Sequence, residues 1–242
     1  MKKIILILFL SIGLIGCSAI DYSEFSMPKN PIDTEFERIL ALDLSHDDSI
    51  KEANKNYDPN LVASVIKLLN NRKERSDAAL LEAETVNEYA EKIQISDNNL
   101  KFVAPKILDT KNRSMVGNPD AFEYFLLGVK NNDDGSIKHK VNFSITYKSD
   151  EKRNYSSASF CDKWNTCDDE NLVEINLISS KASGCSSVNC DYNEVVELNL
   201  TDEFLRANME NNLSINFNSI ASKSNKISLP SAYIKGYLKI TN

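Results

Sequence analysis

The sequence predicts an α+β protein, in which a helical segment of about three helices precedes an antiparallel β-sandwich of immunoglobulin-like type. Apolar residues recur at helical spacing over residues 32–100, and beyond this region they alternate with a period of two. Short apolar segments separated by polar turns then continue to the C-terminus. This regular spacing favours an antiparallel sandwich over a parallel sheet.

The chain is expected to have four successive parts. Residues 1–16 are predicted to be a signal peptide and residues 17–31 a turn-rich tether. Residues 32–100 form the helical region, and residues 101–242 form the sandwich domain. The change of period near residue 100 is the one place where a domain boundary is expected.

The start of the second expected helix is the best defined. Asp58 suits an N-cap, and Pro59 suits the first helical position because its fixed φ is compatible with a helix and its missing N–H is not needed there. The first helix carries Phe36, Ile39, Leu40 and Leu44 on one face, and the third covers residues 73–93.

The clearest strand covers residues 139–147, where Val141 and Phe143 alternate with polar residues on what reads as a half-buried strand. A second strand at residues 122–129 precedes it, and the turn residues 131–135 predict a hairpin between the two. Further strands are predicted at residues 172–178, 195–200, 213–217, 226–229 and 233–240, with a short capped helix or turn at residues 201–206.

The N-terminus predicts export. Lys2 and Lys3 precede an apolar stretch, residues 4–15, which has the length of a signal-peptide core. As a helix, about 12 residues would rise only about 18 Å, too little to cross a hydrocarbon core of about 30 Å. This stretch is therefore interpreted as a targeting segment rather than a membrane span.

The cleavage region predicts a lipid anchor by resemblance. Residues Leu14-Ile15-Gly16-Cys17 resemble the lipobox of bacterial lipoproteins. The resemblance implies that Cys17 carries diacylglycerol, becomes the N-terminus after cleavage and is acylated on its amine. Two or three acyl chains give stable anchoring, so the membrane is a partner through the lipid. Ser18 resembles the outer-membrane sorting pattern, which implies attachment there, facing the periplasm; the alternative is an ordinary secretory signal with an incidental cysteine.

The C-terminal part carries a second resemblance. The segment 184–194 with its two cysteines, followed by Leu229-Pro230 and Tyr233-Ile234 before Gly236, is similar to uncharacterised bacterial lipoproteins with a β-domain. The resemblance implies fold and location but no activity. As part of that fold, it implies that the residues from Leu229 to Gly236 close a final hairpin.

Composition restricts the partners. The chain is 42% hydrophobic and 26% charged, as in ordinary globular proteins, and its net charge is −7. Removal of Lys2 and Lys3 with the signal peptide takes this charge to −9. An acidic body is repelled by phosphate backbones, so nucleic-acid binding is not expected. The expected partner is a protein of the cell envelope; the alternatives are a glycan or no stable partner.

Four cysteines remain once Cys17 is assigned to the lipid. Exported cysteines pair by oxidation, and these four allow three connectivities. Local pairs are favoured, Cys161 with Cys167 and Cys185 with Cys190, because a short polar loop separates each pair. The alternative is a four-thiolate zinc site, which the loose spacings and the oxidising compartment disfavour.

Catalytic residues are sparse. The chain has only two histidines: His46 is expected at a solvated helix end, and His139 at the surface where a strand begins. Neither completes a Ser/His/Asp or Cys/His set, so no catalytic residue, metal or cofactor is assigned. Trp164, between Cys161 and Cys167, is the candidate binding residue.

The resulting functional expectation is a lipid-anchored cell-envelope protein that acts as a non-enzymatic binding or adaptor module. A hydrolase or metal-dependent enzyme is the first alternative, and a pocket lined by Ser, Asp and either His46 or His139 would favour it. A small-ligand or glycan-binding lipoprotein is the second, in which Trp164 would line the groove.

Overall fold

The structure is a computed structural model that describes residues 30–96, 98–111, 120–162, 166–168 and 170–241. The chain divides into two compact units, one ending at Ser76 and the other beginning at Asp77.

The N-terminal unit is helical. It contains α1 (Pro31–Leu40), α2 (His46–Ala53) and the first part of α3 (Pro59–Glu91). Capping side chains explain where the first two begin: the Asn30 side chain accepts the Ile32 N–H, and the Ser45 hydroxyl accepts the Asp48 N–H. The core of this unit consists of Ile39, Ala53, Val65 and Leu69.

Helix α3 corrects the prediction of separate helices from Pro59 and from residue 73. The structure has one helix across both segments. Neither glycine nor proline occurs between them, so nothing in the sequence interrupts the hydrogen-bonded ladder.

The C-terminal unit contains two antiparallel sheets, as far as the structure describes the chain. The larger sheet has the order β1-β2-β4-β5-β9-β8, and β3 also pairs with β4. Its strands are β1 (Gln94–Ser96), β2 (Lys101–Val103), β3 (Ile107–Lys111), β4 (Asp120–Lys130), β5 (Ile137–Ser149), β8 (Asn176–Ser183) and β9 (Cys190–Leu200).

The smaller sheet has the order β11-β10-β6-β7. Its strands are β6 (Tyr155–Cys161), β7 (Val173–Glu174), β10 (Leu213–Ser219) and β11 (Ser224–Leu229). The predicted α+β class and the antiparallel pairing are therefore confirmed.

The core of this unit lies between the two sheets. In β4, β5 and β9, buried residues alternate with more exposed ones, as the period of two predicts. The ring of Phe143 on β5 stacks on that of Phe217 on β10, with centroids 4.4 Å apart. This stacking between the two sheets stabilises the core beyond what burial of the two rings contributes.

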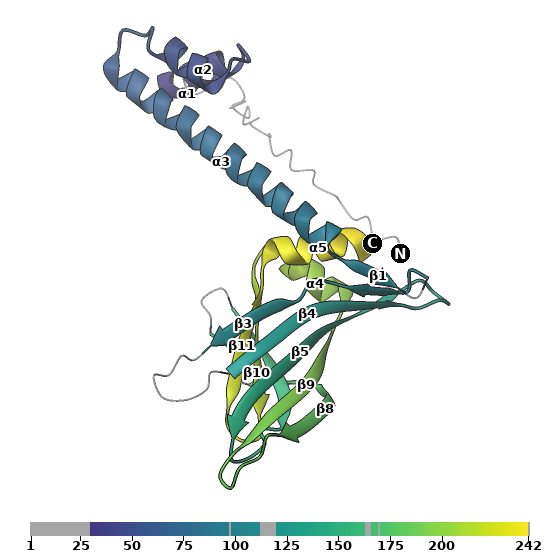
Figure 1. The fold of residues 1–242 in the computed structure, drawn as a ribbon. Coiled ribbons are helices and arrows are strands. Elements are labelled where there is room, and N and C mark those ends of the chain that lie inside the picture. The colour runs from purple at the N-terminus through teal and green to yellow at the C-terminus, as the bar shows by residue number, and fades with distance from the viewer. Residues whose placement is uncertain (1–29, 97, 112–119, 163–165, 169, 242) are drawn as a thin grey trace, which may run out of the picture. The chain divides into compact units, whose positions relative to one another are not determined.

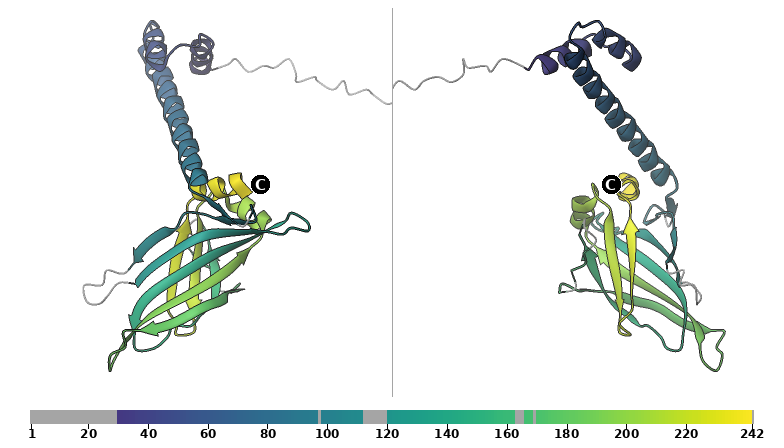
Figure 2. Two further views of the ribbon diagram at one scale, coloured as in Figure 1. Left: turned by 45° about the vertical axis from the view of Figure 1, so that its right-hand side comes forward. Right: turned by 90° about the vertical axis from the view of Figure 1, so that its left-hand side faces the viewer.

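Two helices, α4 (Asp202–Asn208) and α5 (Ser231–Thr241), lie across one end of the sheets (Figures 1 and 2). Helix α5 overturns the prediction of a strand at residues 233–240 and of a final hairpin. Tyr233, Ile234, Tyr237 and Leu238 are all buried, and they recur at the spacing of one helical face. Burial of this face decides the conformation, although tyrosine, isoleucine and glycine are poor helix formers.

Candidate functional site

An open groove with a volume of about 980 Å³ lies at the end of the sandwich beside α4. Residues 135–140 of the β4–β5 hairpin and the start of β5 form one side, and residues 199–203 and 206, from the end of β9 into α4, form another. Asn176 of β8 and Thr241 of α5 complete the lining. Four segments that are distant in the sequence therefore meet around one space.

Local packing positions α4 along the groove. The Thr201 hydroxyl accepts the Phe204 N–H at 3.1 Å and so caps the helix. Leu205 is fully buried, and the ring of Phe204 lies 4.4 Å from that of Phe160. With this face fixed in the core, Asp202 and Arg206 share the groove side at i and i+4.

His139 is one of the residues that line the groove. It is on β5, opposite Gly128 of β4 and Leu200 of β9, and only 2% of it is exposed. The expected surface position is therefore wrong. His139 is in phase with Val141 and the following inward residues of β5, so it points into the core.

Both ring nitrogens of His139 face protein groups. Nδ1 lies 2.8 Å from the hydroxyl of Tyr237. Nε2 lies 3.4 Å from Oδ1 of Asp202 but makes no well-aligned hydrogen bond within the described residues. Oδ2 of Asp202 accepts a hydrogen bond from Nε of Arg206 at 2.6 Å. These contacts form a continuous series from Tyr237 in the core to Arg206 at the groove.

Burial determines the charge states along this series. Desolvation lowers the pKa of His139, while Asp202 opposes that effect. Burial also raises the pKa of Tyr237, so this side chain is a neutral phenol. The hydrogen bond from Arg206 holds the pKa of Asp202 below its usual range. At neutral pH a neutral imidazole therefore faces an ionised carboxylate, an arrangement that favours the tautomer with its proton on Nε2.

The groove can recognise a polar ligand. Lys138 and Arg206 supply cationic groups, Asp202 and Glu203 supply carboxylates, and Asn199 supplies an amide. Lys140 also lines the groove, but its ammonium group lies 2.6 Å from Glu197. His139 also lines the groove, but its Nδ1 is hydrogen-bonded to Tyr237 and its Nε2 faces Asp202, so both ring nitrogens are directed at protein groups.

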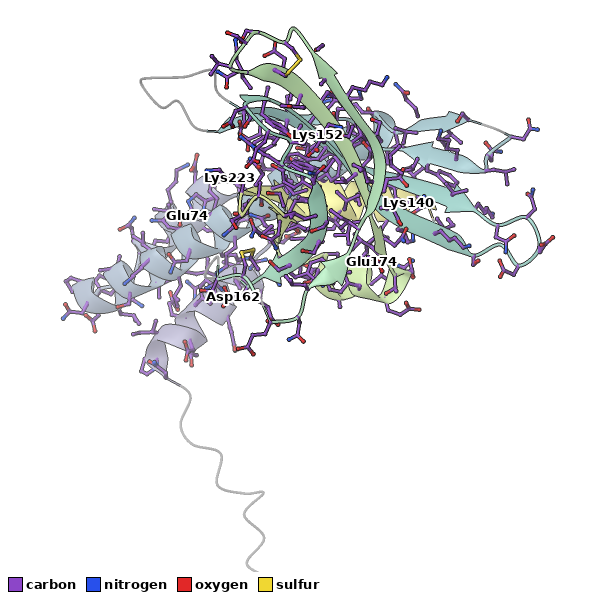
Figure 3. The ribbon with its side chains drawn as sticks, turned by 90° about the horizontal axis from the view of Figure 1, so that it is seen from below. Glu74, Lys140, Lys152, Asp162, Glu174 and Lys223 are labelled. Carbon is purple, nitrogen blue, oxygen red and sulfur yellow. A yellow bond between two sulfur atoms is a disulfide. The ribbon has the colours of Figure 1, made fainter. Side chains whose placement is uncertain are left out.

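The predicted disulfides are both present, Cys161 with Cys167 and Cys185 with Cys190, and Figure 3 draws them as yellow bonds. The zinc alternative is thereby overturned, because no free thiolate remains among these four residues. The cysteines do not line the groove.

The other predicted residues lie elsewhere. Cys17 and Trp164 fall outside the described residues, so the anchor and the tryptophan remain predictions. His46 is the first residue of α2 and does not line the groove. Across residues 30–241, apart from the short gaps, no group of three or more His, Cys, Asp or Glu is arranged to hold a metal ion. None of the helices described there combines the length and the apolar character of a transmembrane span.

A second buried polar cluster ties the two sheets together at another place. The guanidinium group of Arg153 binds both carboxylate oxygens of Asp120 and lies over the ring of Tyr147. Burial works against the charge of Arg153, but hydrogen bonds to Asp120 and Tyr155 outweigh that effect and raise its pKa. The arrangement is structural: Tyr147 and Tyr155 are buried, the side chains of Arg153 and Asp120 are mostly covered, and none of the four lines the groove beside α4.

The phase of His139 with Val141 and Phe143 on the strand is a signal in the sequence for the burial of His139. For Asp202 and Arg206, the capped helix was predicted but its groove-facing side was not. Comparisons with protein-family models, with curated proteins and with solved structures gave no match.

Proposed function

We propose that this protein is a lipid-anchored cell-envelope protein that binds a small polar ligand in the groove beside α4, without catalysing its conversion. The observation that carries the binding proposal is the groove itself. Its volume of about 980 Å³ is at the upper end of the range for small-molecule sites, and charged and amide side chains line it. The inward-facing imidazole of His139 supports binding rather than catalysis.

The anchor rests on the sequence. The order Leu14-Ile15-Gly16-Cys17 after an apolar stretch supports lipidation, and Ser18 supports the outer membrane, facing the periplasm. Metabolic labelling with an alkyne-tagged palmitate tests the lipidation, and subsequent membrane fractionation tests the location. We expect label in the wild-type protein and none in Cys17→Ser. Label that persists in the variant, or a location in the inner membrane, would contradict this part of the proposal.

Ligand binding is tested by amide NMR. Neutral sugars and amino acids are titrated at pH 7.5, and a true ligand should shift residues 135–140 and 199–206 together. Lys138→Gln should weaken that binding. Lys148→Gln is the matched control, because Lys148 lies on the same strand outside the groove. Equal effects of the two variants would argue against the groove.

The second candidate function is that of an adaptor, supported by the edge of β8. Among the described strands, β8 pairs with β9 alone, which leaves one edge for an added strand. Leu177 and Ile178 on β8 are 49% and 54% exposed. The register shift between Leu177 and Ser179, together with Lys181, protects this edge from indiscriminate pairing.

A pull-down from detergent-solubilised envelope tests the adaptor function. A stoichiometric partner that is retained by wild-type protein and by Val188→Lys, but lost with Ile178→Lys, supports strand addition at β8. Val188 is a suitable control because it is exposed in the neighbouring disulfide loop. A partner retained by both variants would place the interface elsewhere.

We also propose that the two sheets are a variant of the immunoglobulin-like sandwich. The antiparallel pairing and the shared core support this assignment. An experimental structure whose strand connections do not superpose on an immunoglobulin domain would contradict it.

A further inference from the structure

We propose that Asp202 moves from Arg206 to His139 when His139 takes up a proton, and that the Arg206 guanidinium, no longer bonded to the Asp202 carboxylate, then binds an anionic oxygen group of a ligand in the groove. This inference rests on the proposed function of the groove and adds both a ligand class and a mode of regulation.

The structure places Asp202 between two basic groups. Its Oδ2 accepts from Nε of Arg206 at 2.6 Å, while its Oδ1 lies 3.4 Å from Nε2 of His139. The first contact is a short charge-assisted hydrogen bond, and the second is an approach without a well-aligned bond. The Asp202 carboxylate is partly exposed, so a small movement is enough for it to leave Arg206 and to form a hydrogen bond with His139 instead.

Among the described residues, Asp202 is the one charged acceptor that the surroundings of His139 offer to an added proton. Helix α4 contributes Asp202 and Arg206, and α5 contributes the neutral hydroxyl of Tyr237. The neighbouring strands place Gly128 and Leu200 opposite His139, and neither side chain is titratable. In the imidazolium, Nδ1–H can donate to the Tyr237 oxygen, and Nε2–H then has Asp202 as its charged acceptor.

The groove supplies the cations for an anionic group. Arg206 and Lys138 both line it, and the Arg206 guanidinium already binds the carboxylate of Asp202. Carboxylate, sulfate and phosphate groups all fit the planar guanidinium fork. A ligand with such a group therefore competes with Asp202 for Arg206, and protonation of His139 removes the competitor.

The test uses sulfate, whose charge does not change between pH 5.5 and 7.5, at constant ionic strength. Sulfate is titrated into the full-length protein, and binding is followed by the amide NMR signals of residues 135–140 and 199–206. We expect the affinity to rise several-fold on going from pH 7.5 to 5.5. The rise is at most tenfold per pH unit, because one proton is linked to binding. By reciprocity, sulfate should raise the pKa of His139, which is read from its own ring resonances without any substitution.

Variants separate the steps. Asp202→Asn should bind sulfate at pH 7.5 as tightly as the wild type does at pH 5.5. His139→Gln should keep the wild-type affinity at pH 7.5 and gain nothing at pH 5.5. His46 remains in this variant, so it controls for the other histidine and for general acidification. Arg206→Gln should lose binding at both pH values.

Equal wild-type affinity at the two pH values, or pH dependence that persists in His139→Gln, would overturn the inference. A neutral ligand bound at pH 7.5 would leave the proposed function standing in that case, so the two failures are distinguishable. Parallel titrations with glycerol phosphate and glucuronate then show whether the anionic group resembles a lipid headgroup or an acidic sugar.

Discussion

The hydroxyl oxygen of Tyr233 lies 3.0 Å from the backbone nitrogen of Leu126 and accepts its N–H. The same hydroxyl donates to the carbonyl oxygen of Pro105, also at 3.0 Å. The register along β4 shifts here, since Val103 opposes Leu127 whereas Ile107 opposes Tyr124. One extra residue on the β2–β3 side interrupts the ladder, and the tyrosine from α5 replaces the missing pairing.

Tyr233→Phe should lower the free energy of unfolding by about 1–3 kcal/mol, because it leaves a buried N–H and a carbonyl without their partner. Urea denaturation measures this loss. Tyr57→Phe is the control and should be neutral, since Tyr57 is fully exposed. A neutral Tyr233→Phe would mean that water or a backbone shift satisfies both groups.

Gly236→Ala should destabilise the protein although alanine favours helices. A Cβ at this position of α5 would lie 2.7 Å from the carbonyl oxygen of Val86 and 2.8 Å from Cβ of Tyr89. Overpacking of this kind costs about 1–3 kcal/mol, which exceeds the helix-propensity gain of at most about 1 kcal/mol. Thermal unfolding should show the loss, whereas Lys239→Ala on the exposed side of α5, which removes one surface hydrogen bond to Asn87, should cost less. A more stable Gly236→Ala variant would show that α5 can move away from α3, which carries Val86 and Tyr89, at low cost.

Stability should depend on pH through His139. Burial lowers its pKa in the folded state, so the unfolded chain binds more protons below about pH 6.5. The contribution of neutral His139 is thus complete above that pH and is lost as the pH falls towards the lowered pKa. Urea denaturation from pH 7.5 to 5 should show a shallower decline for His139→Gln than for the wild type. Parallel declines would indicate that His139 titrates alike in both states.

The disulfide between Cys185 and Cys190 should stabilise its loop without creating the fold. Closing so short a loop is worth about 2 kcal/mol through the entropy of the unfolded chain. The double variant Cys185→Ser with Cys190→Ser should therefore unfold at lower urea concentration but keep the wild-type amide spectrum at residues 135–140 and 199–206. Spectral changes throughout the groove would show that this loop supports more than its own hairpin.

Much of the fold could be predicted because the decisive contacts are local. The alternation in β5 and the turn before it are visible in successive residues, and both disulfides join cysteines five or six positions apart. The cap Thr201 likewise identifies α4 from a few neighbouring residues. The strand expected at residues 233–240 was wrong because local propensity was outweighed by burial of Tyr233 and Tyr237 against the sheets.

By itself the sequence determined the two periodicities, the local pairs of cysteines, the acidic charge and the lipobox-like N-terminal pattern. Only the tertiary structure decided that His139 lies between Tyr237 and Asp202. These three residues come from β5, α5 and α4, separated by long stretches of chain. Their approach depends on how the sheets and helices pack, which no short pattern of residues encodes.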